Sequence, residues 1–180
     1  MPVSGESRHG EMGAVMSDDD KSMAEQASES FIVHDLGKGL LAGLVATIVV
    51  AVLIMLKDAV GLAPEFNVID FFGKMMGSTW PGAGWLLLFT VGVILGLCFA
   101  VLDARVEIHP GTDEPIRGAL FGVLIWFALM LFLMPAYGAG LFGMNIGIAA
   151  PVTLLVITVV HGYISGMLYG KMNPENLSDE

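Results

Sequence analysis

One histidine of this sequence lies within a long apolar segment, on a helical face that carries two more polar side chains. Ser165 and Tyr169 follow His161 at four-residue steps, so an α-helix would place the three side chains one above another. An ionisable side chain at membrane depth marks a functional site by default. His161 is therefore either a contact for a proton, ligand or cofactor, or a neutral imidazole hydrogen-bonded to a neighbouring helix. The second interpretation is favoured because a neutral imidazole costs less to bury than a charge, and its candidate partners are Thr47, Thr90 and Thr158.

Other side chains that could bind a metal or cofactor lack the required spacing. A haem held by two histidines needs ligands on facing helices, but His9, His34 and His109 lie in polar segments. A symmetric dimer that shares His161 is the remaining arrangement. The lone Cys98 excludes an intramolecular disulfide and a thiolate zinc cluster. Thioethers suit Cu(I), but the methionines are not clustered with a histidine and serve as apolar filler: Met55, Met75, Met76, Met130, Met134 and Met144. We predict no metal and no cofactor.

Catalytic motifs are missing from the apolar segments. The sequence contains no nucleotide-binding loop, no metalloprotease pattern and no Ser/His/Asp spacing there, so we expect no enzyme. Lys57 and Asp58 end the first apolar segment. Lys57 is expected to reach the lipid headgroups, with a buried ion pair that guides a solute as the alternative. Asp103 and Arg105 are expected to be solvated.

Four long apolar segments must position these side chains. They run over about 39–59, 84–102, 116–134 and 148–169, and each approaches the roughly 20 apolar residues that cross a bilayer. The chain is 55% hydrophobic and only 14% charged, whereas soluble domains carry about 25% charged residues. We predict an all-α membrane protein whose transmembrane domain spans residues 37–171.

Two loops join the segments on the outer side of the membrane. In the first loop, Phe66, Ile69, Phe72 and Met76 have helical spacing after Pro64, which predicts a short amphipathic helix in the outer interface. The second loop, residues 135–150, is rich in glycine and carries no charge. It is predicted to be a tight turn rather than a re-entrant segment, because non-helical backbone at depth needs protein or water around it.

Each apolar segment carries a pair of glycines four residues apart. Small residues let membrane helices approach closely, so we predict helix packing through these positions, with a bundle that is narrower at their end. The basic-Gly-x-Leu-x-Gly pattern of residues 38–43 recurs at 117–122, and 92–99 resembles 162–169. The chain therefore reads as two tandem helical hairpins in the same orientation, a parallel repeat. The eight glycines are Gly39, Gly43, Gly92, Gly96, Gly118, Gly122, Gly162 and Gly166.

The ends of the chain are polar and acidic. The net charge is −10, and we predict a disordered acidic tail over 1–36 and a short acidic tail over 172–180. No basic stripe exists to bind nucleic acid. Lysine and arginine near the spans place both termini in the cytoplasm. The cytoplasmic side would hold Arg8, Lys21, Lys38, Arg105, Arg117 and Lys171, and the outer side Lys57 and Lys74.

Several of these motifs carry a family resemblance. The stretch 38–47, the stretch 117–122, Met134-Pro135 with the glycine-rich 138–143, and His161 to Gly166 are similar to a family of uncharacterised four-span prokaryotic membrane proteins, a domain of unknown function. The resemblance covers roughly 37–171. It implies a helical inner-membrane protein and assigns no activity or site.

Three roles fit this reading. The favoured one is a small non-catalytic component of a prokaryotic inner membrane, in contact with the lipid bilayer, that forms a homo-oligomer or joins a larger membrane complex through its glycine faces. The alternative is a small transporter or channel whose pathway passes between the two hairpins near His161. A redox subunit that binds a cofactor comes third.

Overall fold

A computed structural model describes residues 18–105 and 113–172. The chain divides into two units, Met1–Val33 and His34–Glu180. Helix α1 (Asp18–Ala59) begins in the first unit and continues into the second. The second unit also contains α2 (Val68–Met75), α3 (Ala83–Arg105), α4 (Glu114–Ala128), a π-helical turn η1 (Leu129–Leu133), α5 (Met134–Ala136), a 3-10 turn η2 (Leu141–Gly143) and α6 (Ala149–Lys171). The described residues contain no strand, so the all-α prediction is confirmed.

Four helices are long and apolar enough to cross a membrane. They are Asp35–Ala59, Ala83–Asp103, Glu114–Ala136 and Ala149–Lys171, within a few residues of the predicted segments. The chain is thus a multi-pass membrane protein. Of the predicted tails, residues 1–17 and 173–180 lie outside the described residues, and α1 already begins at Asp18.

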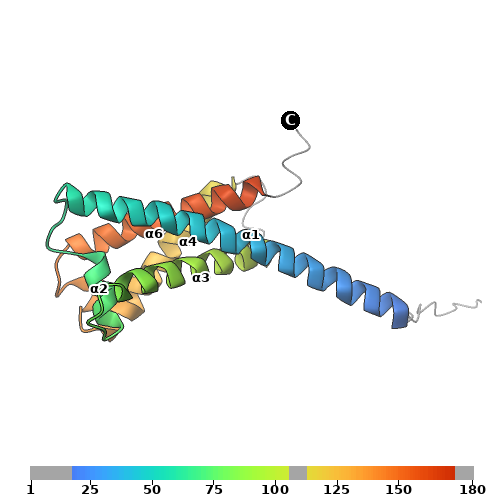
Figure 1. Cartoon of the computed structure of the whole chain (residues 1–180), viewed down its shortest axis with the longest axis horizontal. Helices are drawn as coiled ribbons and strands as arrows, with labels where there is room; N and C mark the ends of the chain where they lie inside the picture. Colours follow the sequence, from blue (N-terminus) through green and yellow to red (C-terminus); the bar gives the residue numbers. More distant parts are fainter. Residues whose placement is uncertain (1–17, 106–112, 173–180) are drawn as a thin grey trace, which may run out of the picture. The chain divides into compact units, whose positions relative to one another are not determined.

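The four spanning helices of the second unit lie side by side, and α2 covers one end of them (Figure 1). We call this the α2 end. At the opposite end, the spanning parts of α1 and α4 begin and those of α3 and α6 finish. Seven of the eight paired glycines lie toward that end, which we call the glycine end, and Gly92 lies near the middle of its span.

Two glycine seams hold neighbouring spans together. In the seam between α1 and α3, a Cβ added to Gly43 would lie 2.8 Å from the Cα of Gly96. In the seam between α4 and α6, a Cβ on Gly122 would lie 2.9 Å from the Cα of Val159. Backbones meet at these points because no side chain separates them. All eight glycines are buried, and each seam lies within one hairpin, so these glycines face helices of their own chain.

Helix α2 closes the α2 end of the bundle. The side chain of Asn67 caps it by accepting a hydrogen bond from the Asp70 amide at 3.0 Å, so the predicted short helix begins at Val68 rather than near Pro64. Phe66 and Val68 are buried in the main apolar core, and a Cβ on Gly84 of α3 would overlap the Ile69 carbonyl. One face of α2 is therefore part of the protein interior. The core they join contains Val50, Ile54, Met130, Met134 and Leu154.

A π-helical turn precedes the second loop. Pro135 has no amide hydrogen, so the regular ladder is interrupted there, and the Met134 amide bonds to the Leu129 carbonyl instead. The loop then folds through successive tight turns. Gly140 has φ 76° and ψ 170°, a conformation essentially restricted to glycine. Asn145 closes the loop by donating to the Ala139 carbonyl at 3.0 Å and to that of Gly138 at 3.1 Å.

Candidate functional site

His161 forms a buried hydrogen bond with Thr47 that joins the two hairpins. The distance from His161 Nε2 to Thr47 Oγ1 is 3.2 Å, and both side chains are buried. Thr47 Oγ1 also lies 2.6 Å from the Gly43 carbonyl and donates to it. A hydroxyl has one proton, so Oγ1 must accept from the imidazole and Nε2 must carry a hydrogen. Of the three candidate threonines, Thr47 is the partner, while the other two donate to carbonyls of their own helices, at Leu86 and Leu154.

The glycine seam makes room for this bond. A Cβ on Gly92 of α3 would overlap Thr47 Oγ1, so any larger residue there would displace the hydroxyl. The repeat-related positions carry no equivalent pair. When the glycine pairs of the two hairpins are aligned, Trp126 corresponds to Thr47 and Val91 to His161. The polar bridge therefore occurs once and breaks the symmetry of the repeat.

Ser165 and Tyr169 continue the same face of α6 but do not contact the imidazole pair. Ser165 is 1% exposed, and its Oγ has no hydrogen-bond partner within the described part of the protein. The ring of Tyr169 lies edge-on to Phe99, with centroids 5.9 Å apart, and Phe99 in turn contacts Phe121 at 5.6 Å. These three rings form an aromatic cluster between the hairpins, two turns from His161 toward the glycine end.

A small cavity lies beside His161. Its volume is about 40 Å³, which is enough for one water molecule. All four spanning segments and α2 contribute to its wall, through residues that include Thr47, Phe72, Leu88, Thr158 and His161. The cavity thus lies where the four spans and α2 meet.

A partly buried ion pair joins the hairpins at the glycine end. Asp103 was expected to be solvated, but its side chain is only 10% exposed and lies 2.9 Å from Arg117 Nη1. The expectation was wrong because Arg117 of α4 lies against Asp103 of α3, and it also lies 3.5 Å from Glu114 of its own helix. Asp35 and Lys38 of α1 form a pair at 3.1 Å with the same three-residue spacing as Glu114 and Arg117. The Arg105 side chain lies outside the described part of the structure.

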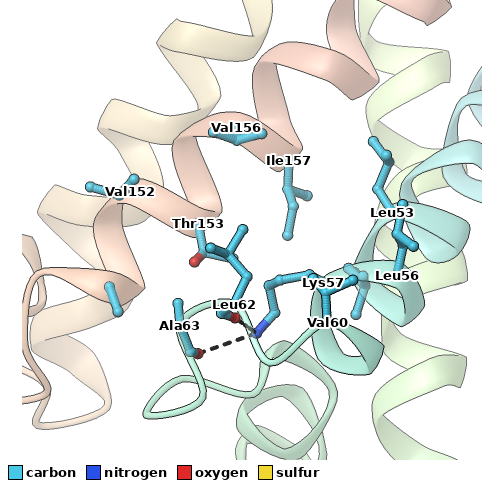
Figure 2. Close-up of a pocket in the computed structure, with 12 residues that line it drawn as sticks. Leu53, Leu56, Lys57, Val60, Leu62, Ala63, Val152, Thr153, Val156 and Ile157 are labelled. Atoms are coloured by element: carbon cyan, nitrogen blue, oxygen red, sulfur yellow. Dashed lines mark hydrogen bonds between the residues drawn. The ribbon is translucent and has the colours of Figure 1, made fainter.

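Lys57 binds the loop that follows α1. Its Nζ donates to the carbonyls of Leu62 and Ala63, as Figure 2 shows, at 3.2 and 3.3 Å, and to that of Phe66 at 3.0 Å. It also pairs with Asp58 at 2.9 Å. The ammonium is therefore committed to the protein instead of extending freely toward headgroups. The sequence does not predict this role, because the acceptors are backbone carbonyls, which every residue type has.

The described residues contain no group of three or more His, Cys, Asp or Glu that could hold a metal ion. The methionines that were weighed as copper ligands are dispersed. Met130 and Met134 are fully buried in the core, whereas Met55 and Met144 are exposed.

Comparison with known proteins gives one match. The model of the Family of unknown function (DUF6789) matches residues 33–179, which include all four spans. This confirms the resemblance to a domain of unknown function. No curated protein and no solved structure matches the chain.

Proposed function

Because the chain belongs to this family of unknown function, we propose its role from its geometry. We propose that the protein is a non-catalytic component of a prokaryotic inner membrane and that it assembles with other membrane proteins. The observation that carries the proposal is the closure of the bundle on itself. The glycine seams are filled by their own chain, and the His161 and Arg117 side chains are bonded across the hairpins. The His161 and Arg117 side chains thus stabilise the arrangement of the helices.

The assembly surface we propose lies on α4 and the π-helical turn. This face is apolar and exposed, and Phe132 is its most exposed side chain at 71%. The π-turn displaces the following residues around the helix axis, and such turns are frequent at functional sites. The face consists of Leu120, Leu124, Phe127, Leu131 and Phe132.

Affinity purification in a mild detergent tests this role. We expect stoichiometric membrane partners, or a defined homo-oligomer, and we expect Leu124→Ala combined with Phe132→Ala to reduce their recovery at least several-fold. Leu86→Ala, on an exposed position of α3, is the matched control and should retain them. A chain that remains monomeric and without partners at native expression would refute the proposal.

We propose that the glycine end and both termini face the cytoplasm. The excess of lysine and arginine near this end supports the orientation. A phosphatase fusion at the C-terminus should be inactive and a cytoplasmic fluorescent reporter active. The opposite pair of results would reverse the orientation.

A second role, as a small transporter, is supported by one specific observation. Ser165 Oγ is buried and has no hydrogen-bond partner among the described residues, and it lies one turn from His161 and the cavity beside it. In transporters built from repeats, binding sites lie near the membrane midplane between the repeats, which is where His161 lies. The cavity holds no more than a water-sized species, so the candidate solute is a proton.

Proteoliposomes that carry a pH-sensitive dye test this second role. Proton flux under an imposed gradient should exceed that of empty liposomes and be abolished by His161→Ala, with Thr90→Val as a control. If the flux equals that of empty liposomes, proton transport is ruled out. If His161→Ala leaves it unchanged, His161 is not part of the pathway.

A further inference from the structure

An apolar groove opens on the surface between α1 and α6 at the α2 end (Figure 2). Its volume is about 440 Å³, within the range of small-molecule sites. The walls are almost entirely aliphatic. Leu53, Leu56 and Val60 line it from α1, and Val152, Val156 and Ile157 from α6.

The depth of the groove in the membrane determines whether it contacts lipid or water. Its α1 wall lies within or directly beside the span Asp35–Ala59, and its α6 wall lies in the span Ala149–Lys171. At this depth the surrounding medium is hydrocarbon rather than water. An open hollow of this size on a lipid-facing surface must therefore be filled by a hydrocarbon chain or by a partner's side chains.

The mouth of the groove is charged and lies where its α1 wall ends. Lys57, a lining residue, and Asp58 form an ion pair there at 2.9 Å, and the Asp58 side chain is 37% exposed. Carbonyls of Leu62 and Ala63 point into the same region, toward the Lys57 ammonium (Figure 2). The Lys57 ammonium is already bound by these groups, so the Asp58 carboxylate is the charge that a headgroup meets, and it complements the ammonium of a zwitterionic headgroup.

We propose that this groove binds one acyl chain of a zwitterionic phospholipid, with the headgroup beside Asp58. The headgroup ammonium lies toward the exposed carboxylate of Asp58. The chain descends between α1 and α6 and ends near Ile157. The lipid fills the wedge between the two hairpins at the end of the bundle where glycine seams are missing.

The groove and the cavity beside His161 share a wall. Ile157 lines both the groove and the cavity beside His161. A lipid chain in the groove packs against the side chain that separates it from the cavity, and so supports the interior around the imidazole.

Photocrosslinking with a phosphatidylethanolamine that carries a diazirine near the end of its acyl chain tests the site. The full chain is reconstituted in nanodiscs of that lipid, and crosslinked peptides are mapped by mass spectrometry. We expect crosslinks concentrated on 53–60 and 149–157. A distribution spread evenly over the exposed faces of the four helices would overturn the proposal.

A substitution that fills the groove provides the second part of the test. Thr153→Phe places a ring into the groove and should reduce these crosslinks at least five-fold, while Leu86→Phe on the exposed face of α3 should leave them unchanged. Equal labelling of both variants would contradict the site. Crosslinks between two copies of the chain at this groove would also overturn it, because a second copy would then be the occupant. If Thr153→Phe fails to fold, the crosslink map of the unchanged protein decides alone.

Discussion

Gly118→Ala adds one methyl group to the seam between α4 and α6, where its effect can be worked out. The new Cβ would lie 3.0 Å from the Cα of Gly166 and would overlap the Gly162 carbonyl. Carbon atoms attract best at about 3.5–4.0 Å, so the contact with the Gly166 Cα alone requires a separation of roughly 0.5–1 Å, and the overlap with the Gly162 carbonyl requires at least as much. A gap of that size forfeits about a quarter to a half of each contact along the seam. Overpacking of this kind costs about 1–3 kcal/mol.

Gly37→Ala is the matched control. Gly37 is also helical, but a Cβ there meets no atom within 4 Å. Both substitutions gain the same helix propensity, about 0.8–1 kcal/mol, so the difference between the variants isolates the seam. We expect Gly118→Ala to be the less stable by about 1–3 kcal/mol when SDS-induced unfolding in mixed micelles is followed by circular dichroism. If the two unfold within about 0.5 kcal/mol of each other, close backbone contact does not stabilise the bundle.

Three further predictions use the same unfolding measurement. Thr47→Val removes the hydroxyl that accepts from the buried imidazole and should cost about 1–3 kcal/mol. Thr90→Val, which removes only an exposed bond within one helix, should stay within about 0.5 kcal/mol, and equal losses would show that the inter-hairpin bond does not matter. A double-mutant cycle of Asp103→Asn and Arg117→Gln should give a coupling energy of about 0.5–3 kcal/mol, and strict additivity would mean that the buried pair adds nothing. Gly140→Ala forces a side chain into a glycine-only conformation and should cost about 1–3 kcal/mol; an unchanged midpoint would indicate that the loop adopts another conformation.

The spans and hairpins could be predicted because length and apolar composition decide them. About 20 apolar residues suffice to identify a span, and four of them with two short connections leave little freedom of topology. The short helix before α3 was also predictable from the spacing of Phe66, Ile69 and Phe72. Its burial was not, because the same amphipathic period suits a membrane surface and the end of a helix bundle equally well.

Partners across the bundle could not be predicted from the sequence. Three threonines were candidate partners for His161, and only the relative rotation of α1 and α6 selects Thr47. Asp103 looked like a solvated residue because the sequence does not show that Arg117 returns to the same depth from the next hairpin. The loop carbonyls that bind Lys57 cannot be identified from residue types. In each case the missing information was a distance between segments remote in the chain.

The placement of both seams has a consequence for biosynthesis. Each seam joins spans that leave the ribosome one after the other, so the first pair can close before α4 has been made, and N-terminal parts generally fold first. The bridge from Thr47 to His161 and the pair of Asp103 with Arg117 then form in a later docking step. Two separately expressed halves, cut in the linker between α3 and α4, should consequently recognise one another in the bilayer and reconstitute the whole.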